Sequence, residues 1–322
     1  MFEEIQLGAI VVSTIRNAPV LIFAAMAGLF AERSGVIDLA LEGKMLASAF
    51  VSAAVAFTFQ NPWLGILAGV FASSVLALIQ GFVSITQKGN QLVGGIAINI
   101  AMSGLTFVLA QYFFQQGGQT PNLGDARLFD IVLPGTAALA DVPFLGWFYG
   151  QVLGGHTALV YAAFLLIPFV HWLLYHSSFG LRLRACGDNP HAADAAGVSV
   201  QRTRYAAMLI AGILCSFSGA YISIVQSGFF LRDMTAGAGY LALTAMVFGN
   251  WRPIYTALGC IMFGFFSAVQ IQIEGVDLPV VGRIPGSLIQ MIPYVVTVIV
   301  LAGLMAKSVA PKALGTPFVK SR

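Results

Sequence analysis

Long apolar stretches without a single charge alternate with short charged segments along this chain of 322 residues. Between Lys44 and Lys88 lie about 43 consecutive uncharged residues, and a helix needs about 20 apolar residues to cross a bilayer core. This gap therefore holds two spans, and the later gaps hold one span each, in two cases together with a loop. Because lipid offers a bare backbone no hydrogen-bond partner, every span must be helical.

The pattern predicts an all-α polytopic membrane protein with about nine membrane segments. One segment, 236–250, is too short for a full crossing and indicates a short or re-entrant helix. The predicted spans are 9–31, 39–59, 64–86, 92–114, 157–175, 205–226, 236–250, 254–274 and 287–306.

Composition excludes several classes of protein. Charged residues make up 9% of the chain and apolar residues 58%, whereas a soluble domain carries about 25% charge. So few charges cannot keep a protein of this size soluble in water. This excludes a water-soluble enzyme, a nucleic-acid binder and a disordered scaffold. We expect one transmembrane domain over 1–322, with an outer loop at 115–155, a cytoplasmic loop at 177–204 and a cytoplasmic tail at 307–322.

Lysine and arginine in the loops predict the orientation, because positively charged loops stay in the cytoplasm. If the N-terminus is outside, eleven of these residues fall on the inner side. Only Arg127, Arg232 and Arg283 then fall outside. The distribution predicts an outer N-terminus and an inner C-terminus.

Two stretches of the chain resemble each other. Gly35–Leu46 aligns with Gly237–Phe248, and the two share a glycine and the run Leu-Ala-Leu. With the orientation above, the first stretch runs outward and the second inward. Repeats of opposite orientation are typical of transporters that rock around a midplane site, so we interpret the similarity as an inverted repeat.

The loop 177–204 contains the pattern of a short capped helix. An Asp-Asn pair offers an N-cap, Pro190 suits the first helical position, and Gly197 ends the helix. Such a helix is marginal alone in water. It is either a solvated connector or a protrusion that inserts into a cytoplasmic partner, and its small alanines and the flanking arginines favour the second. The residues concerned are Asp188, Asn189, Pro190, Asp194, Ala195, Ala196 and Gly197.

This loop resembles the coupling loop of ABC-importer permeases, in the branch that serves branched-chain amino acids, simple sugars and nucleosides. The segment 32–46, ERSGVIDLALEGKML, resembles the second-span motif of that branch. The segments 248–253, FGNWRP, and 313–319, ALGTPFV, resemble the nucleoside-type permeases. Lys44 departs from the pattern, because relatives are expected to carry an uncharged polar residue there.

The resemblance implies the pore subunit of a larger machine in a bacterial inner membrane. It implies an ATP-binding partner subunit, a second and related permease, and an extracytoplasmic binding lipoprotein. The chain contains no G-x-x-x-x-G-K-[ST] motif, so it is expected to bind no ATP or other cofactor and to be no enzyme. ATP and Mg²⁺ would lie on the partner. No histidine or cysteine spacing predicts a metal site.

Three polar residues within predicted spans are candidates for the translocation path: Glu42, Lys44 and Asn99. Each also has a structural interpretation. Glu42 lies near a helix start, where a negative charge is favourable, and Lys44 is close enough to the inner interface to snorkel. Asn99 can bond a neighbouring helix rather than a substrate hydroxyl.

Other substrates and another mechanism stay open at this stage. Simple sugars and branched-chain amino acids fit the same branch. A proton- or sodium-coupled secondary transporter would also use an inverted repeat, with Glu42 as its proton carrier. The capped loop argues against this alternative.

Overall fold

The computed structural model describes residues 7–132, 134, 142, 147–273, 277–278, 282–283, 291, 295, 298 and 309–320. Seven helical segments in this part of the chain are long and apolar enough to cross a membrane. They coincide with seven of the predicted spans, so the chain is a multi-pass helical membrane protein. The predicted span 287–306 lies outside the described residues except at three isolated positions.

The long helices are α1 (Leu7–Arg33), α2 (Leu41–Phe59), α3 (Pro62–Gly81), α4 (Gln91–Phe114), α7 (Ala158–His176), α10 (Val200–Ala220) and α12 (Pro253–Ile273). Short π-helices, η1 (Phe82–Thr86) and η4 (Tyr221–Ser227), extend α3 and α10. The shorter helices are η2 (Gly124–Ala126), η3 (Phe148–Leu153), α8 (Ser178–Asp188), α9 (Pro190–Ala195) and α11 (Ala238–Phe248). Two-residue strands β1 (Asp277–Leu278) and β2 (Gly282–Arg283) pair antiparallel.

Asparagine caps set several of the helix starts. The Asn61 side chain accepts hydrogen bonds from the backbone of Trp63 and Leu64, and Pro62 occupies the first position of α3. Asn90 caps α4 in the same way. These interactions depend only on neighbouring residues, which explains why the predicted boundaries of these spans lie close to the observed ones.

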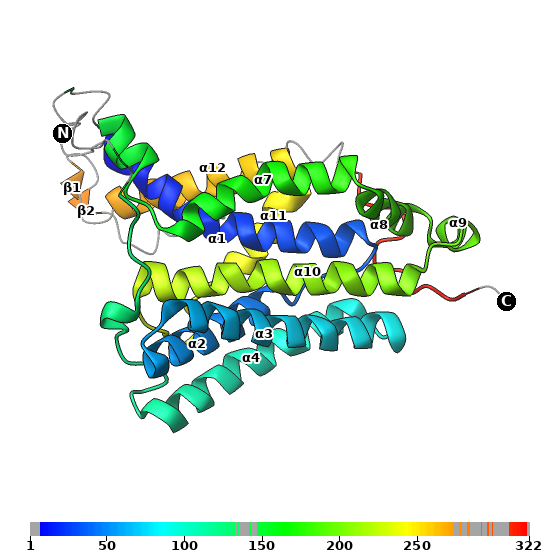
Figure 1. Cartoon of the computed structure of the whole chain (residues 1–322), viewed down its shortest axis with the longest axis horizontal. Helices are drawn as coiled ribbons and strands as arrows, with labels where there is room; N and C mark the ends of the chain where they lie inside the picture. The colour runs from blue at the N-terminus through cyan, green and yellow to red at the C-terminus, as the bar shows by residue number, and fades with distance from the viewer. Residues whose placement is uncertain are drawn as a thin grey trace.

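Helices α1 and α10 lie side by side along the middle of the bundle, with α2, α3 and α4 on one side and α7, α11 and α12 on the other (Figure 1). Every residue from 18 to 32 of α1 is buried. Close approach of α10 to α2 depends on Gly219, since a Cβ there would lie 2.1 Å from the Met45 carbonyl oxygen. The core is therefore built around α1 and α10.

The two ends of the bundle differ. Helix α1 begins at one end, and α8, α9 and the C-terminal segment lie at the other (Figure 1). The described residues nearest the two ends of the chain, at 7 and 320, therefore lie at opposite ends of the bundle. Which end faces the cytoplasm stays a prediction from the charges.

The segment 177–204 contains more helix than expected. Its first part forms α8, which sequence analysis did not predict, and α10 begins at Val200 rather than near 205. Asp188 is the last residue of α8, so Asn189 alone caps α9. The Ser177 hydroxyl accepts a hydrogen bond from the Gly180 amide and starts α8, a signal that lay outside the apolar pattern.

The two repeat halves both form a helix, a turn and a second helix. Gly35 and Gly237 both have a left-handed backbone, with φ of +92° and +83°. The helix starts differ, however: α2 begins six residues after its glycine and α11 one residue after. The inverted repeat therefore stays a prediction.

Candidate functional site

Two helices that each follow a non-helical stretch, called the interrupted helices below, start close together inside the bundle. Helix α2 begins only at Leu41, after a non-helical segment at 34–40, and α11 begins at Ala238 after another non-helical stretch. With 11 residues, α11 is about 16 Å long, which is about half of a bilayer core of about 30 Å. The prediction that 236–250 is too short to cross is confirmed.

Glu42 joins the starts of these two helices. Its carboxylate accepts hydrogen bonds from the Gly237 amide at 2.8 Å and from the Gly239 amide at 2.7 Å. Both amides belong to the N-terminus of α11, whose free N–H groups carry a partial positive charge. The Glu42 carboxylate is therefore favourably placed at two helix N-termini, that of α11 and that of its own helix α2.

Lys44 lies in a closed network. Its ammonium pairs with Asp38 and donates to the Gln80 side chain at 3.2 Å, and all three side chains are fully buried. The Gln80 amide in turn donates to the Ile37 carbonyl. Lys44 therefore does not snorkel, and that interpretation is wrong, because the 34–40 segment brings a carboxylate within its reach.

Asn99 ties α4 to the same region. Its side-chain oxygen accepts from the Gly43 amide at 2.8 Å, and its amide group donates to the Leu39 carbonyl and the Tyr240 hydroxyl. Gly43 permits this approach, since a Cβ there would lie 2.9 Å from Asn99. Asn99 therefore links α4 to the start of α2 and to α11.

The three candidates thus gather at one place, although they come from two helices. We refer to Asp38, Glu42, Lys44, Gln80, Asn99 and Gly237 as the half-helix junction. Sequence analysis did not assign Asp38, Gln80 or Tyr240 a role. The one signal for Asp38 was its position six residues before Lys44 in the same motif.

The hydrogen bonds of the half-helix junction run within the protein. Glu42, Lys44 and Asn99 all bond to protein groups, so the arrangement holds helix starts together. One Asp38 carboxylate oxygen has no hydrogen-bond partner among the described residues. A charged network of this kind resists partial disruption, because an unpaired buried charge is costly.

At the end of the bundle, α9 projects beyond the long helices (Figure 1). The Asn189 side chain accepts from the Ala192 amide at 3.0 Å, and Gly197 closes the helix with φ of +83°. Pro190 and Ala193 are buried, whereas Ala195, Ala196 and Gly197 are exposed. The exposed residues at the C-terminal end of α9 therefore carry only small side chains.

The other residues predicted to contact the ATPase also lie at or near the surface. Asp188 and Asn189 are exposed, and Asp194 is half-buried. Nearby Cys186 faces inward, and burial raises the pKa of its thiol, which keeps it protonated at neutral pH.

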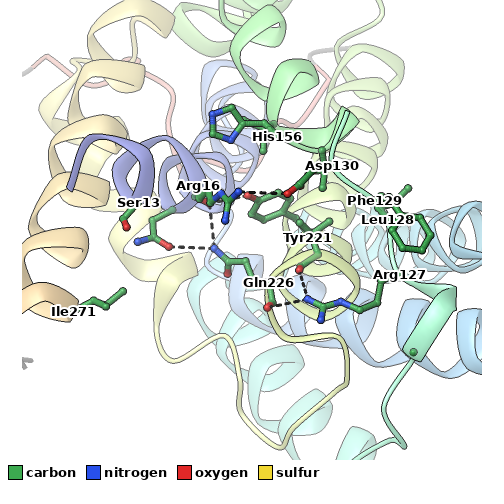
Figure 2. A pocket seen from close by; sticks show the side chains of 15 residues that line it. Ser13, Arg16, Arg127, Leu128, Phe129, Asp130, His156, Tyr221, Gln226 and Ile271 are labelled. Carbon is green, nitrogen blue, oxygen red and sulfur yellow. Dashed lines mark hydrogen bonds and ion pairs between the residues drawn. The ribbon is translucent and has the colours of Figure 1, made fainter. Parts of the chain in front are cut away.

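The opposite end carries a polar pocket of about 650 Å³. Figure 2 shows that Arg16 of α1, Asp130 of the loop after η2, and Tyr221 and Gln226 of η4 converge on it. Arg16 pairs with Asp130 at 3.4 Å, and the Arg16 carbonyl accepts from the Tyr221 hydroxyl and the Gln226 amide. The lining residues are Ser13, Arg16, Asn17, Gly124, Arg127, Leu128, Phe129, Asp130, His156, Thr157, Val160, Tyr221, Val225, Gln226 and Ile271.

The pocket wall contains neutral as well as charged donors. Burial lowers the pKa of His156, so its ring is neutral at pH 7 and bonds the Val152 carbonyl. Arg127 donates to the Val225 carbonyl at 2.8 Å. Sequence analysis did not predict this pocket, since its walls come from five distant segments.

Residues 10–301 match the family of the branched-chain amino acid transport system permease component. A nucleoside ABC transporter permease of Lactococcus lactis is 34% identical to this chain over 310 residues, which cover 94% of each. A guanosine ABC transporter permease of Bacillus subtilis is 33% identical over 98% of each chain. A putative glucose ABC transporter permease of Haloferax volcanii is 32% identical over 83% of this chain and 78% of its own length.

Proposed function

Since the chain belongs to the family of branched-chain amino acid transport system permeases, we propose that it is the membrane subunit of an ATP-driven nucleoside importer. The observation that carries the choice of nucleosides is the similarity, over nearly the full length, to permeases named for nucleosides and for guanosine. Family membership also implies partnership with an ATP-binding subunit.

The proposal includes the finer features of topology and assembly. The chain forms a single permease domain over 1–322, with about nine membrane segments, an outer N-terminus and an inner C-terminus in a bacterial inner membrane. It pairs with a second, related permease, and a lipoprotein delivers the substrate from outside. The excess of basic residues at the α9 end and the interrupted helices support this arrangement.

In the proposed mechanism, the residues from Asp188 to Gly197 receive the motion of the ATPase. Ala195, Ala196 and Gly197 offer the exposed contact beside the half-buried Asp194, and Asn189 and Pro190 keep α9 folded. ATP and Mg²⁺ bind to the partner, and this chain hydrolyses nothing. The motion re-orients α2 and α11 about the half-helix junction, where Glu42, Lys44 and Asn99 hold the helix starts.

The polar pocket is proposed to receive the substrate at the outer end. Nucleosides are neutral and carry many hydrogen-bonding groups, which suits a wall of amide, hydroxyl and neutral imidazole groups around one ion pair. Phe129 is 70% exposed and lines the pocket, where a ring can stack on a base.

The test is uptake by the complete complex in proteoliposomes. Labelled guanosine or uridine should enter only with ATP inside and the binding lipoprotein outside. Unlabelled nucleosides should compete, whereas excess ribose, glucose or leucine should not. Uptake driven by a proton or sodium gradient without ATP would instead support a secondary transporter and overturn the proposal.

A sugar is the second candidate substrate, because a relative of 32% identity is named for glucose. The competition experiment separates the two. Glucose that competes as well as guanosine would favour a sugar permease, and leucine that competes would favour an amino-acid permease.

A further inference from the structure

The C-terminal segment 309–320 makes contacts with five separate parts of the bundle. We call this segment the C-terminal strap. It was expected only to be a cytoplasmic tail, and it contains the sequence ALGTPFV. Its path begins at the turn between α11 and α12, where the Val309 amide donates to the Asn250 side chain at 3.0 Å.

The middle of the strap is held by backbone hydrogen bonds. The Ala313 amide donates to the Gly187 carbonyl at the end of α8, at 2.9 Å. The Gly315 amide donates to the Gly35 carbonyl at 3.1 Å. Gly315 has a left-handed φ of +75°, and a Cβ there would lie 2.8 Å from the Ile37 side chain. The strap is thus fitted directly against the 34–40 segment.

Arg204 fastens the strap and this segment to each other. Its guanidinium donates to the Ser34 carbonyl at 3.1 Å and to the Thr316 carbonyl at 3.2 Å. The side chain is fully buried, with 1% of the residue exposed. A single buried cation from α10 therefore bonds the beginning of the 34–40 segment and the strap at once.

The far part of the strap packs on α9. The Phe318 ring lies 5.3 Å from the His191 ring and is buried in a small cluster with Cys186, Ala193 and Val200. Helix α9 has six residues, too few to be stable alone. Phe318 is the largest side chain of this cluster, so the strap supplies much of the apolar surface that holds α9.

From these contacts we propose that the C-terminal strap transmits motion from α9 to the half-helix junction. Phe318 and Gly315 are three residues apart, about 10 Å at most along the chain, so α9 and the 34–40 segment are linked by a short tether. The 34–40 segment carries Asp38 and leads directly into Glu42. A displacement of α9 therefore pulls on the residues that hold the starts of α2 and α11.

The covalent connection through α10 offers a different route. Helix α10 with η4 runs along the whole bundle and contacts α1, α2 and α3, so it moves only with the core. The strap touches α9 and the 34–40 segment without crossing the core. This inference rests on the proposed function, since transmission matters only if α9 receives a partner.

The experiment measures nucleoside uptake per ATP hydrolysed by the full complex in proteoliposomes. Phe318→Ala removes the ring from α9, Phe318→Leu keeps an apolar side chain, and Val319→Ala is the matched control, since Val319 is 55% exposed. We expect Phe318→Ala to lower uptake per ATP by about fivefold or more, in the range of typical coupling between sites. Assembly with the ATPase and ATP hydrolysis should remain, as should the ratio in the other two variants.

A second variant tests the other end of the strap. Gly315→Val places a β-branched residue at a left-handed position against Ile37 and should separate the strap from the 34–40 segment. It should lower uptake per ATP in the same way, even if Phe318→Ala does not yield an assembled complex.

Two results would contradict the proposed role of the C-terminal strap. One is an unchanged ratio in both variants, and the other is a loss of uptake, hydrolysis and assembly together in both, which would mean a purely structural role. Failure of the wild-type complex to import nucleosides with ATP would instead contradict the proposed function itself. The two proposals can therefore fail separately.

Discussion

At the scale of single residues, the charged groups inside the bundle are neutralised by specific partners. Lys44 has Asp38 and Gln80, and Glu42 has two backbone amides of α11. Removing one member of a buried pair leaves an uncompensated charge, whereas removing both can be nearly neutral. Each residue can therefore be tested by comparing single and double substitutions.

Lys44→Met is expected to lower the free energy of unfolding by about 3–5 kcal/mol, because Asp38 is left charged and buried. The double variant Lys44→Met/Asp38→Leu should recover most of this loss. Denaturant unfolding in detergent, followed by tryptophan fluorescence, measures both. Lys88→Met is the control, since Lys88 is exposed. Equal stability of Lys44→Met and the wild type would contradict the network.

Glu42→Gln retains an acceptor oxygen for one of the two α11 amides but removes the negative charge at the helix start. The expected loss of stability is about 0.3–2 kcal/mol, the usual range for a charge at a helix end. ATP-driven uptake should persist. If the variant instead abolished an uptake that follows a proton gradient, Glu42 would be a proton carrier and the importer would be a secondary transporter.

At the scale of elements, α9 and α11 are both short helices whose stability comes from other parts of the chain. Glu42 caps α11 from α2, and Phe318 covers α9 from the C-terminal strap. Short helices that depend on distant contacts can change position when those contacts shift, which long self-stabilised helices do less readily. This property suits the two elements that the proposed mechanism moves.

The exposed alanines of α9 give a prediction for docking. Ala195→Leu or Ala196→Leu is expected to weaken binding of the ATP-binding subunit by about 10–100-fold, because a larger side chain in a close contact costs about 1–3 kcal/mol. Ala101→Leu on α4, also exposed, is the matched control. Pull-down with the cognate ATPase measures the effect. Undiminished binding and transport would remove α9 from the interface.

At the scale of the whole molecule, the three regions of the proposed mechanism lie in order along the bundle. The polar pocket is at the end where α1 begins, the half-helix junction lies inside, and α9 with the strap is at the other end (Figure 1). Substrate and ATPase would therefore act at opposite ends of one molecule. The strap and the interrupted helices are the structures that link these ends.

The pocket end is tested by Asp130→Asn, which breaks the ion pair with Arg16. Both side chains are about half-exposed, so the loss of stability should stay below about 1 kcal/mol. If the pocket receives substrate, the KM for uptake should rise several-fold with little change in hydrolysis by the ATPase. A variant with unchanged KM would place substrate reception elsewhere.

Much of the fold follows from local features that can be read along the chain. The length of each uncharged run limits the number of crossings, because the thickness of the bilayer sets one helix length for every span. Asparagine caps and glycine stops act over a few residues, which explains why α9 was predicted with its cap at Asp188 or Asn189 and its end at Gly197. Sequence analysis missed α8, because its residues do not form a long uncharged run.

Only the tertiary structure decided which residues meet. Glu42 bonds amides 195 and 197 residues away, Arg204 joins Ser34 to Thr316, and the pocket is lined by five segments. No local rule predicts such partners, since a side chain buried in lipid or protein bonds whichever polar group the packed helices bring to it. The sequence therefore revealed a membrane permease with a short capped helix, and the three-dimensional arrangement revealed how that helix is tied to the centre of the bundle.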